Sequence, residues 1–455
     1  MAELVVLQNP LLPPPPGPVE VASVPKIHLL PGNPPLVFVV DGSRLFETTP
    51  DCFEELQSDP ERAEDTVTGS MPINSRREGH QALPAPTAIS LNVAQSCNLS
   101  CSYCYADEGR FGKRETMMSQ EVARASIDRL LEQGGGQRVT IGFIGGEPFL
   151  NRKLIHWAVD YAKIRAKETG AYVRFSITTN GTLVNTEDLN LLRTNAFAVS
   201  VSLDGGAEQN DHERQGRNGE SVFRQSIDRL RPLLEAPGRA RITARATVSR
   251  RDLRIHERLT GLFEEGFKEV GVSPLRTSPV AELALREDDW GILLGEMVRA
   301  AEAELQELPR HGRLRFSNLA IALKQIHAGY CKPLPCGSAA SYVSVSARGE
   351  YFTCHRTVDD SRYFLGNTSE GLSSEARATF LRARHVDMQQ PCRSCWARYL
   401  CGGGCHAEVL SAGRSGCDYI RGWLNYCLRT YNTVLTEYPS LFENGSGHDS
   451  ENFSA

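Results

Sequence analysis

The sequence predicts an α/β protein with a parallel sheet, a small β-rich module before it and a cysteine-rich region after it. Between residues 86 and 275, short apolar segments alternate with amphipathic segments of helical period. Such alternation is typical of parallel strands joined by right-handed crossovers, with the helices outside the sheet. The chain also holds 13 cysteines, and most of them follow residue 330. In a chain without a secretory signal, cysteines favour metal ligation over disulfides.

Before the sheet, the sequence predicts a leader, a hairpin and a linker. Residues 1–35 include a run of consecutive prolines and are expected to be an extended or disordered leader. Apolar segments on either side of Asp41-Gly42 predict two short strands joined by a tight turn. A short helix is expected to begin at Cys52, and the polar segment 67–84 is expected to be a linker.

Six apolar segments are the strand candidates of the sheet. Helical patterns lie between them; in residues 119–133, Ser119 is placed to cap a helix whose apolar residues share one face. In barrels of this kind the site lies at the carboxyl ends of the strands, so the residues that follow each strand are the site candidates. The strands are expected at residues 88–93, 139–144, 173–178, 198–203, 242–248 and 269–273.

Three cysteines follow the first of these strands at the spacing C-x3-C-x2-C. Thiolates of Cys97, Cys101 and Cys104 would bind three corners of one cubic iron–sulfur cluster. The fourth iron would then have no cysteine ligand and would be open to chemistry. A structural zinc site is the alternative, but it needs four protein ligands. No further Cys or His occurs in the ten residues after Cys104.

A glycine pair and a carboxylate follow the second strand, in the run Gly145-Gly146-Glu147-Pro148. Glycines let the backbone approach a ligand closely, and a carboxylate there accepts hydrogen bonds from a charged amine. The alternative is an ordinary turn between a strand and a helix. The position of the run after its strand favours a ligand site.

Short polar side chains end the third and fourth strands. Thr179 and Asn180 close the third, and Ser202 and Asp204 close the fourth. Such side chains would donate to a carboxylate or accept from ribose hydroxyls, but they also form ordinary turns. Asp204 would contact cofactor or substrate, or make only an Asx turn. The polar residues that come next are expected on a loop, either meeting a carboxylate or in solvent: His212, Arg214 and Arg217.

The C-terminal third carries the second cysteine pattern. Cys336 and Cys354 frame Gly349 as C-x12-G-x4-C, and a C-x2-C-x5-C-x3-C run follows from Cys392 to Cys405. A zinc ribbon would use the C-x2-C pair, but nine cysteines exceed the ligands of two zinc sites by one. The nine are Cys331, Cys336, Cys354, Cys392, Cys395, Cys401, Cys405, Cys417 and Cys427.

The run ISLNVAQSCNLSCSYCYA closely resembles the cluster loop of radical S-adenosylmethionine (radical SAM) enzymes. This resemblance implies a partial (β/α)6 TIM-like barrel and a 4Fe–4S cluster whose open iron is chelated by S-adenosylmethionine. Reductive cleavage of that cofactor would give a 5′-deoxyadenosyl radical that abstracts hydrogen from substrate. Gly145-Gly146-Glu147 matches the motif that binds the amino group of S-adenosylmethionine. Thr179, Asn180 and Ser202 are expected to complete its site.

The later cysteines resemble the SPASM domain, a C-terminal extension of peptide-modifying radical SAM enzymes that holds two auxiliary 4Fe–4S clusters. Together with the first cluster, this implies three clusters. The last ligand is expected to be Cys417, because the run from Cys417 to Trp423 resembles relatives; Cys427 is the competitor. The resemblance assigns Cys331, Cys336, Cys354 and Cys405 to the first auxiliary cluster, and Cys392, Cys395, Cys401 and Cys417 to the second.

Single residues and short runs indicate which reaction type within the family the chain resembles. Sulfatase-maturing relatives carry a catalytic aspartate where this chain has His355. The cluster loop, the hairpin module and the run CGGGCHAE look more like thioether-forming peptide maturases, including that of quinohemoprotein amine dehydrogenase. Carbon–carbon crosslinking or sulfatase-type oxidation is the alternative. The partners implied are a peptide or small protein and a flavodoxin- or ferredoxin-type electron donor, with the hairpin module binding a leader by strand addition.

Composition excludes several other classes. A net charge of −5 argues against a general nucleic-acid binder, and no apolar run is long enough to span a membrane. The N-terminus lacks a secretory signal, so a cytoplasmic location is expected. An iron–sulfur electron carrier or zinc protein is the non-enzyme alternative, but it has no need of the strand-end motifs. The expected segments are the leader 1–35, the module and linker 36–85, the barrel 86–275, a helical bridge 276–330, the SPASM domain 331–430 and a tail 431–455.

Overall fold

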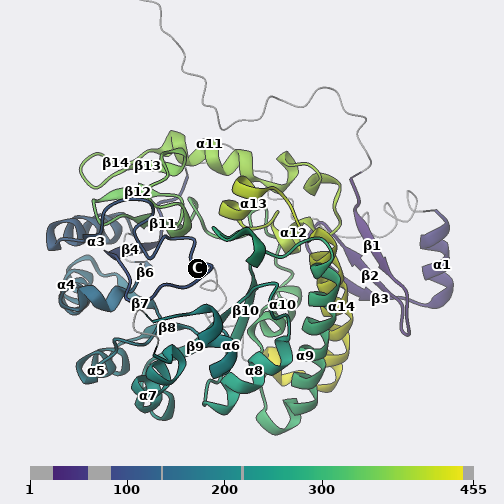
Figure 1. Cartoon of the computed structure of the whole chain (residues 1–455). Coiled ribbons are helices and arrows are strands. Elements are labelled where there is room, and N and C mark those ends of the chain that lie inside the picture. The colour runs from purple at the N-terminus through teal and green to yellow at the C-terminus, as the bar shows by residue number, and fades with distance from the viewer. Residues whose placement is uncertain (1–23, 60–82, 135–136, 217–219, 444–455) are drawn as a thin grey trace, which may run out of the picture.

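A computed structural model describes residues 24–59, 83–134, 137–216 and 220–443 (Figure 1). All six expected strands are present and run in parallel, in the order β10-β9-β8-β7-β6-β4. This confirms the predicted α/β class. The strands are β4 (Ala88–Gln95), β6 (Arg138–Gly145), β7 (Tyr172–Thr179), β8 (Phe197–Ser202), β9 (Arg241–Val248) and β10 (Val270–Pro274). A two-residue strand, β5 (Thr116–Met117), pairs with the end of β4.

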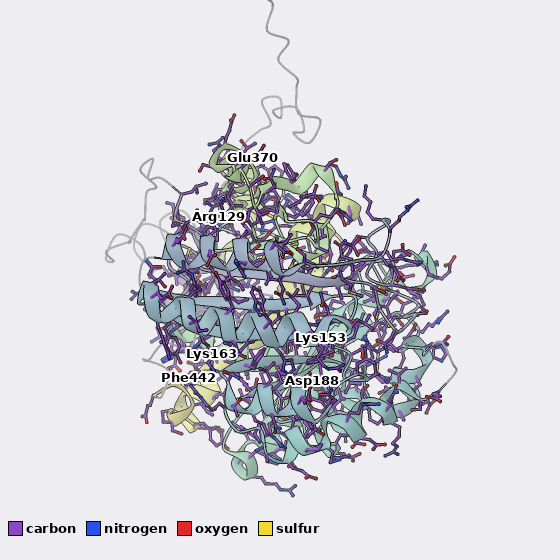
Figure 2. All side chains as sticks on the ribbon, turned by 90° about the vertical axis from the view of Figure 1, so that its left-hand side faces the viewer. Arg129, Lys153, Lys163, Asp188, Glu370 and Phe442 are labelled. Atoms are coloured by element: carbon purple, nitrogen blue, oxygen red, sulfur yellow. The ribbon has the colours of Figure 1, made fainter. Side chains whose placement is uncertain are left out.

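Helices cover the outer face of this sheet, and the alternation along each strand explains why. In β4, Ile89, Leu91 and Val93 are buried in the apolar core, whereas Ser90 and Asn92 point to the opposite face. Figure 2 shows α3, α4 and α5 lying in order over the strands. The connecting helices are α3 (Gln120–Gly134), α4 (Arg152–Thr169), α5 (Thr186–Thr194), α6 (Ala207–Glu213), α7 (Val222–Glu235) and α8 (Ile255–Glu264).

One connection differs from the prediction. The segment that holds His212 was expected as a loop, but it forms the short helix α6. The helix has no apolar stripe; it is held by Asn210, whose side chain is buried and accepts a hydrogen bond from the backbone N–H of Asp204 (3.1 Å). Arg217 lies outside the described residues.

The cysteine-rich region shares the sheet of the barrel. Strand β11 (Tyr342–Val345) pairs in parallel with β4, with Tyr342 opposite Ala88. Ser90 Oγ lies 2.7 Å from Tyr342 Oη, and Asn92 Nδ2 donates to Ser344 Oγ at 2.8 Å. Antiparallel strands β12 (Glu350–Phe352), β13 (Phe364–Asn367) and β14 (Gly371–Leu372) extend the sheet further.

Helices dominate the rest of the chain. The segment expected as a helical bridge contains α9 (Asp289–His311) and α10 (Ser317–His327). Helix α14 continues past residue 431, so the segment expected as a tail begins inside a helix; residues 444–455 lie outside the description. The remaining helices are α11 (Ser374–Arg384), α12 (Arg398–Cys401), α13 (His406–Ala412), α14 (Cys417–Glu437) and α15 (Ser440–Glu443). No helix in the described ranges is long and apolar enough to cross a membrane.

The N-terminal module is a three-stranded antiparallel sheet followed by a helix: β1 (Ile27–Leu30), β2 (Leu36–Val39), β3 (Arg44–Glu47) and α1 (Pro50–Ser58). The hairpin predicted around Asp41-Gly42 joins β2 to β3. The module begins earlier than expected, because β1 comes from residues assigned to the leader and pairs with β2. Residues 1–23 and 60–82, which hold most of the predicted leader and linker, lie outside the described residues.

This module packs against the cysteine-rich region. The His28 ring stacks on Trp396 with centroids 3.8 Å apart, and Asp41 pairs with Arg398 at 3.0 Å. Both partners lie between Cys395 and Cys401. The module therefore contacts the loop that was predicted to hold a cluster.

Candidate functional site

The loop that carries the first three cysteines lies against the glycine pair that follows β6. The backbone N–H groups of Gly146 and Glu147 donate to the carbonyls of Ala94 and Ser96, each at 2.9 Å. A Cβ atom on Gly146 would lie 2.2 Å from the Ser96 carbonyl oxygen and 2.9 Å from Cys97 Cβ. Glycine is therefore required here by close packing of two backbones.

Glu147 is fully buried, and three donors of the chain bind its carboxylate. Oε1 accepts from the N–H of Phe149 (3.1 Å) and the hydroxyl of Thr179 (2.7 Å), and Oε2 accepts from the N–H of Asn180 (2.8 Å). Burial raises the pKa of Glu147 to about 7, against the effect of these hydrogen bonds. Hydrogen bonds to this carboxylate thus connect the end of β6 to the end of β7.

The two predicted residues at the end of β7 have different surroundings. Thr179 is buried and its hydroxyl is directed at Glu147. The Asn180 side chain instead faces the cysteine loop: Nδ2 donates to Asn98 Oδ1 at 3.0 Å and lies 3.9 Å from Cys97 Sγ. Of this pair, Asn180 is the one whose side chain borders the cysteine loop.

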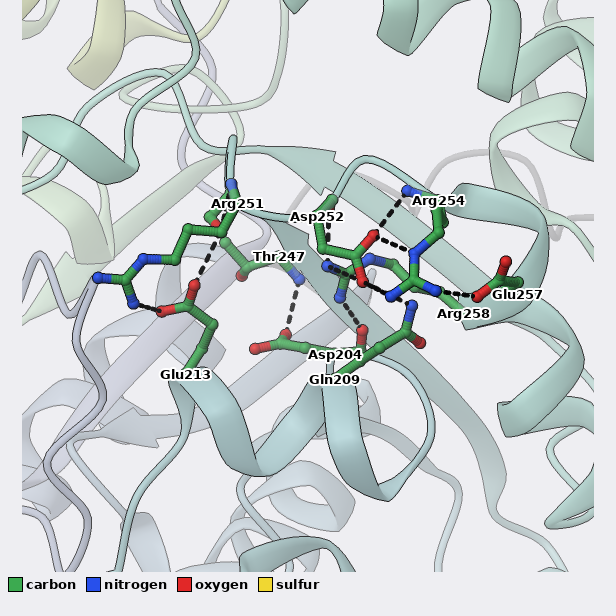
Figure 3. Close-up of polar contacts among 10 residues, drawn as sticks. Asp204, Gln209, Glu213, Thr247, Arg251, Asp252, Arg254, Glu257 and Arg258 are labelled. Carbon is green, nitrogen blue, oxygen red and sulfur yellow. Dashed lines mark hydrogen bonds and ion pairs between the residues drawn. The ribbon is translucent and has the colours of Figure 1, made fainter.

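Asp204, after β8, is bound to the cysteine loop through Tyr103. The Tyr103 hydroxyl donates to Asp204 Oδ2 at 2.5 Å and accepts from Arg214 Nη1 at 2.5 Å. Asp204 Oδ1 accepts from the N–H of Thr247 at 2.8 Å, and Arg258 donates to the Asp204 carbonyl (Figure 3). Burial raises the pKa of Asp204, and the Arg214 guanidinium opposes this rise. Asp204 is therefore part of a buried network and not only a turn former.

The segment after α6 pairs directly with the cysteine loop. The N–H groups of Ser100 and Ser102 donate to the carbonyls of Gln215 and Glu213, each at 3.0 Å. The Glu213 carboxylate accepts from the hydroxyls of Ser102 and Ser249, and Arg251 lies 3.6 Å from it (Figure 3). Helix α6, the segment after it and the residues after β9 thus hold the loop in place.

The first three cysteines lie together in this loop. Cys101 and Cys104 are close enough to Cys97 to disfavour its thiolate, and burial raises the pKa of Cys97 to about 12. Soft thiolates are the ligands that 4Fe–4S clusters use, and a cubic cluster takes each ligand at a different iron. No three His, Cys, Asp or Glu side chains in the described residues are grouped closely enough for a single metal ion. The donor set fits a cluster with one open iron.

The later cysteines form two groups. Cys336 is affected electrostatically by Cys354 and Cys405, and burial raises its pKa to about 11. Cys331 is exposed; the Gly42 N–H donates to its sulfur, and Asp41 and Asp387 have the strongest charge effects on it. Three of the four cysteines expected in the first auxiliary set are therefore neighbours, and Cys331 lies beside the N-terminal module.

The second group contains Cys392, Cys395, Cys401 and Cys417. Cys392 is affected by the other three, and the backbone N–H groups of Gly403 and Gly404 donate to Cys401. Cys427 is completely buried in α14, where burial raises its pKa strongly. Cys417, and not Cys427, lies with the expected second set.

A chain of charged side chains crosses from the cysteine loop to the last barrel strand. The Arg356 guanidinium lies over the Tyr105 ring, 5.0 Å from its centroid, and donates to Glu408 at 2.7 Å. Arg276, which follows β10, lies 3.5 Å from the other Glu408 oxygen. Arg356 also lies 4.0 Å from Cys405 Sγ. Sequence reasoning missed this chain because its members are single charged residues far apart, with no local pattern.

His355 is next to Arg356 and is uncharged at neutral pH. Burial and the Arg356 charge lower the pKa of His355 to about 4. Its Nδ1 lies 3.2 Å from the Tyr342 hydroxyl, and its ring is 6.5 Å from that of Tyr105. His355 thus lies between the cysteine loop and the first auxiliary group.

Comparison with known proteins agrees with this geometry. Residues 91–248 match the radical SAM superfamily model. The chain is 23% identical over 347 residues to the serine-type anaerobic sulfatase-maturating enzyme of Klebsiella aerogenes, covering 73% of this chain and 82% of that one. It is 26% identical over 353 residues to mycofactocin maturase MftC of Mycobacterium tuberculosis, covering 73% and 81%.

Solved structures show the same fold. The structure of native anSMEcpe with bound AdoMet has a TM-score of 0.65 at 19% identity, covering 78% of this chain and 100% of that one. Streptococcus suis SuiB has a TM-score of 0.52 at 13% identity, covering 86% and 96%. With the cysteine loop, the glycine turn and the polar strand ends at one edge of the sheet, residues 91–248 are a radical SAM domain, in an enzyme whose C-terminal region is rich in cysteine.

Proposed function

We propose that this enzyme modifies a peptide or small protein by joining a cysteine sulfur to an unactivated carbon, so that a thioether crosslink forms. The observation that carries the radical chemistry is the convergence of Cys97, the Gly145-Gly146 turn and Asn180 at one edge of the sheet. Substrates of the peptide class are supported by the relatives, which are named as maturases of sulfatases and of mycofactocin. A structure of anSMEcpe with AdoMet and the Kp18Cys peptide, similar at TM-score 0.65, supports the same class.

Two groups would be held at this edge. Cys97, Cys101 and Cys104 would bind a 4Fe–4S cluster, and S-adenosylmethionine would bind beside it. When bound, these groups supply the 5′-deoxyadenosyl radical that takes a hydrogen atom from the substrate. The residues proposed to form the S-adenosylmethionine site are Gly145, Gly146, Glu147, Thr179, Asn180 and Ser202.

The contacts divide these residues by role. Because both oxygens of Glu147 are bound by the chain, Glu147 and Thr179 would shape the turn whose backbone carbonyls face the ammonium group. Asn180 and Ser202 would offer side chains directly. The network of Tyr103, Asp204 and Arg214 would hold the cysteine loop in a fixed position under the cofactor.

The C-terminal cysteines would bind two auxiliary 4Fe–4S clusters, which gives three clusters in all. The first would use Cys336, Cys354 and Cys405 together with Cys331, which lies beside Gly42 of the N-terminal module. A flavodoxin- or ferredoxin-type protein would supply electrons. The second auxiliary cluster would use Cys392, Cys395, Cys401 and Cys417.

The thioether assignment depends on His355. An imidazole at this position differs from the aspartate of sulfatase-maturing relatives and so disfavours sulfatase-type oxidation. Carbon–carbon crosslinking is the second candidate and sulfatase-type oxidation the third. A thioether forms when the peptide loses two hydrogen atoms: one would pass to the 5′-deoxyadenosyl radical, and the other would leave as the thiol proton and one electron, which an auxiliary cluster would accept. The mass of the product and the disappearance of one thiol distinguish this outcome from the other two.

The experiment that tests the radical chemistry uses anaerobically reconstituted enzyme. The wild type is expected to hold about twelve irons and to form 5′-deoxyadenosine from S-adenosylmethionine under a strong reductant. Replacing Cys97, Cys101 and Cys104 by alanine should remove about four irons and all 5′-deoxyadenosine. Stoichiometric zinc without iron, or intact cofactor cleavage in the triple variant, would contradict the proposal.

A further inference from the structure

An arginine lies on the inner face of the barrel, between two of the strands that end at the site. In β9, Ala244, Ala246 and Val248 are buried in the core under the helices, so Thr243, Arg245 and Thr247 point to the opposite, inner face. The strand neighbours of Arg245 are Ser202 in β8 and Gly271 in β10. The inner face is otherwise lined by small and polar residues such as Ser90, Asn92, Gly142, Ser176 and Ser200.

The Arg245 guanidinium has no anionic partner. Within the part of the chain that the structure describes, no hydrogen bond or ion pair reaches its side chain. The buried arginines Arg258 and Arg214 are paired: Arg258 donates to two carbonyls and lies 3.8 Å from Asp252, and Arg214 binds Tyr103. Arg245 is partly buried, and burial alone lowers its pKa, with no carboxylate acting against it. A partly buried cation inside the barrel without a counter-charge is unfavourable, so its place suggests a ligand that brings the negative charge.

The side chain of Arg245 extends across the neighbouring strand. A Cβ atom on Gly271 would lie 2.2 Å from Arg245 Nη1, so the guanidinium lies over β10 at a residue without a side chain. The cation with the largest charge effect on Cys101 is Arg214, which Tyr103 and Asp204 already engage. Among the described residues, Arg245 is therefore the unpaired arginine of this inner face.

We propose that Arg245 binds a carboxylate of the peptide substrate inside the barrel and thereby selects an acidic residue or a C-terminal carboxylate next to the reacting carbon. The guanidinium is planar and presents paired donors that match a carboxylate. S-adenosylmethionine also carries a carboxylate, and Ser202, the strand neighbour of Arg245, is proposed to contact that cofactor. A loss of S-adenosylmethionine affinity in the Arg245→Met variant would assign Arg245 to the cofactor instead. This inference rests on the proposed function, because it requires a peptide in the barrel.

The test is a binding experiment on reconstituted enzyme loaded with S-adenosylmethionine, without turnover. Three probes are titrated by NMR: N-acetylglutamate N-methylamide, its glutamine analogue, and N-acetylalanine, which carries a free terminal carboxylate. The wild type should bind at least one of the two acids about tenfold more tightly than the glutamine analogue. Which acid is preferred tells a side-chain carboxylate from a terminal one.

Variants test whether the preference for the acid probes depends on Arg245. Arg245→Met should abolish the preference for the acid, Arg245→Lys should retain part of it, and both should keep the iron content and the affinity for S-adenosylmethionine. Arg241→Met is the matched control, because Arg241 lies on the same strand and pairs with Glu269 at the surface; it should bind the probes like the wild type.

Three results would overturn the inference: equal affinity of the wild type for acids and amide, a preference that survives in Arg245→Met, or a loss of S-adenosylmethionine affinity in that variant. Since probe binding is read without catalysis, a failure to cleave the cofactor would contradict the proposed function and leave this test valid.

Discussion

Arg356 donates a 2.7 Å hydrogen bond to Glu408, and this pair joins the turn that follows Cys354 to the helix that follows Cys405. Arg276 lies 3.5 Å from the second Glu408 oxygen, so one carboxylate serves two guanidinium groups. One cation comes from the cysteine-rich region and the other from the segment after the last barrel strand. Glu408 therefore connects the cysteine-rich region to the segment that follows the last barrel strand.

Removing this carboxylate should loosen that connection. Glu408→Gln is expected to lower the free energy of unfolding by about 1–2 kcal/mol, a value reduced from that of a fully buried pair because the side chains are partly exposed. Denaturant titration measures the change. Glu307→Gln is the control: its pair with Arg310 is more exposed (45% and 78%) and should be worth less than about 0.5 kcal/mol. Equal effects of the two substitutions would contradict the bridging role.

The close approach of the glycine turn to the cysteine loop gives a second prediction. Gly146→Ala would place a Cβ atom 2.2 Å from the Ser96 carbonyl oxygen, so the loop must shift and the cluster site should be lost. Iron analysis after reconstitution should show about four irons fewer than in the wild type. Gly206→Ala is the matched control, since nothing lies within 4 Å of its added atom. A full iron content in Gly146→Ala would rule out the packing argument.

The hydroxyl of Tyr103 gives a third prediction. Tyr103→Phe leaves Asp204 Oδ2 and Arg214 Nη1 without their shared partner, which should cost about 1–3 kcal/mol. Amide hydrogen exchange should become faster in the cysteine loop, where Tyr103 is the anchor. Tyr161→Phe removes a similar hydroxyl that binds Asp128 on the outer helices, and it should leave exchange in this loop unchanged. Unchanged loop protection in Tyr103→Phe would contradict the anchoring role.

The two late cysteines should behave differently. Cys417→Ala is expected to lower the iron content from about twelve to about eleven, if a three-iron cluster remains, or to about eight, if the cluster is lost, because Cys417 lies with Cys392 and Cys401. Cys427→Ala should keep all irons and cost about 1 kcal/mol of stability as a small buried group is lost. Iron analysis and electron paramagnetic resonance distinguish them, and the reverse pattern would make Cys427 the ligand.

The burial of Glu147 predicts a pH effect in the cofactor-free chain. Its pKa is raised from 4.5 to about 7, so the fold favours the protonated form. The unfolded chain loses this proton above pH 4.5, and the fold must then accommodate a buried charge. This group's contribution to stability should therefore fall as pH rises from 4.5 to 7, by about 3 kcal/mol. Glu147→Gln lacks this slope; a difference between wild type and variant that does not change with pH would refute it.

Most of the fold could be predicted from local sequence patterns. The six barrel strands were found because each is an apolar segment bounded by turn residues, and the residues after them follow from the parallel arrangement. Helix α6 was missed because it is short and polar and is held by Asn210, a contact that no periodicity reveals. The start of β1 was missed because its few apolar residues adjoin a proline-rich segment.

The residues of the site could be predicted from the sequence, but their hydrogen-bond partners could not. The sequence placed Glu147 in the right turn, but the three donors that bind its carboxylate come from backbone and side-chain positions set by the fold. Arg214 was seen only as a candidate for a carboxylate, and its bond to Tyr103 depends on pairing between segments far apart. Arg245 could not be identified from the sequence. An arginine within a strand is common, and only the structure shows that it has no partner among the described residues.

The pairing of β11 with β4 has a consequence for synthesis on the ribosome. Strand β4 emerges early, but the strand that covers its free edge is about 250 residues further along the chain. At typical elongation rates this edge waits for roughly ten to fifty seconds with its backbone groups open to other chains. A chain stopped before β11 keeps an unpaired edge next to the cysteine loop. By pairing with β4, the cysteine-rich region thus protects this strand edge from aggregation, whether or not the region holds metal.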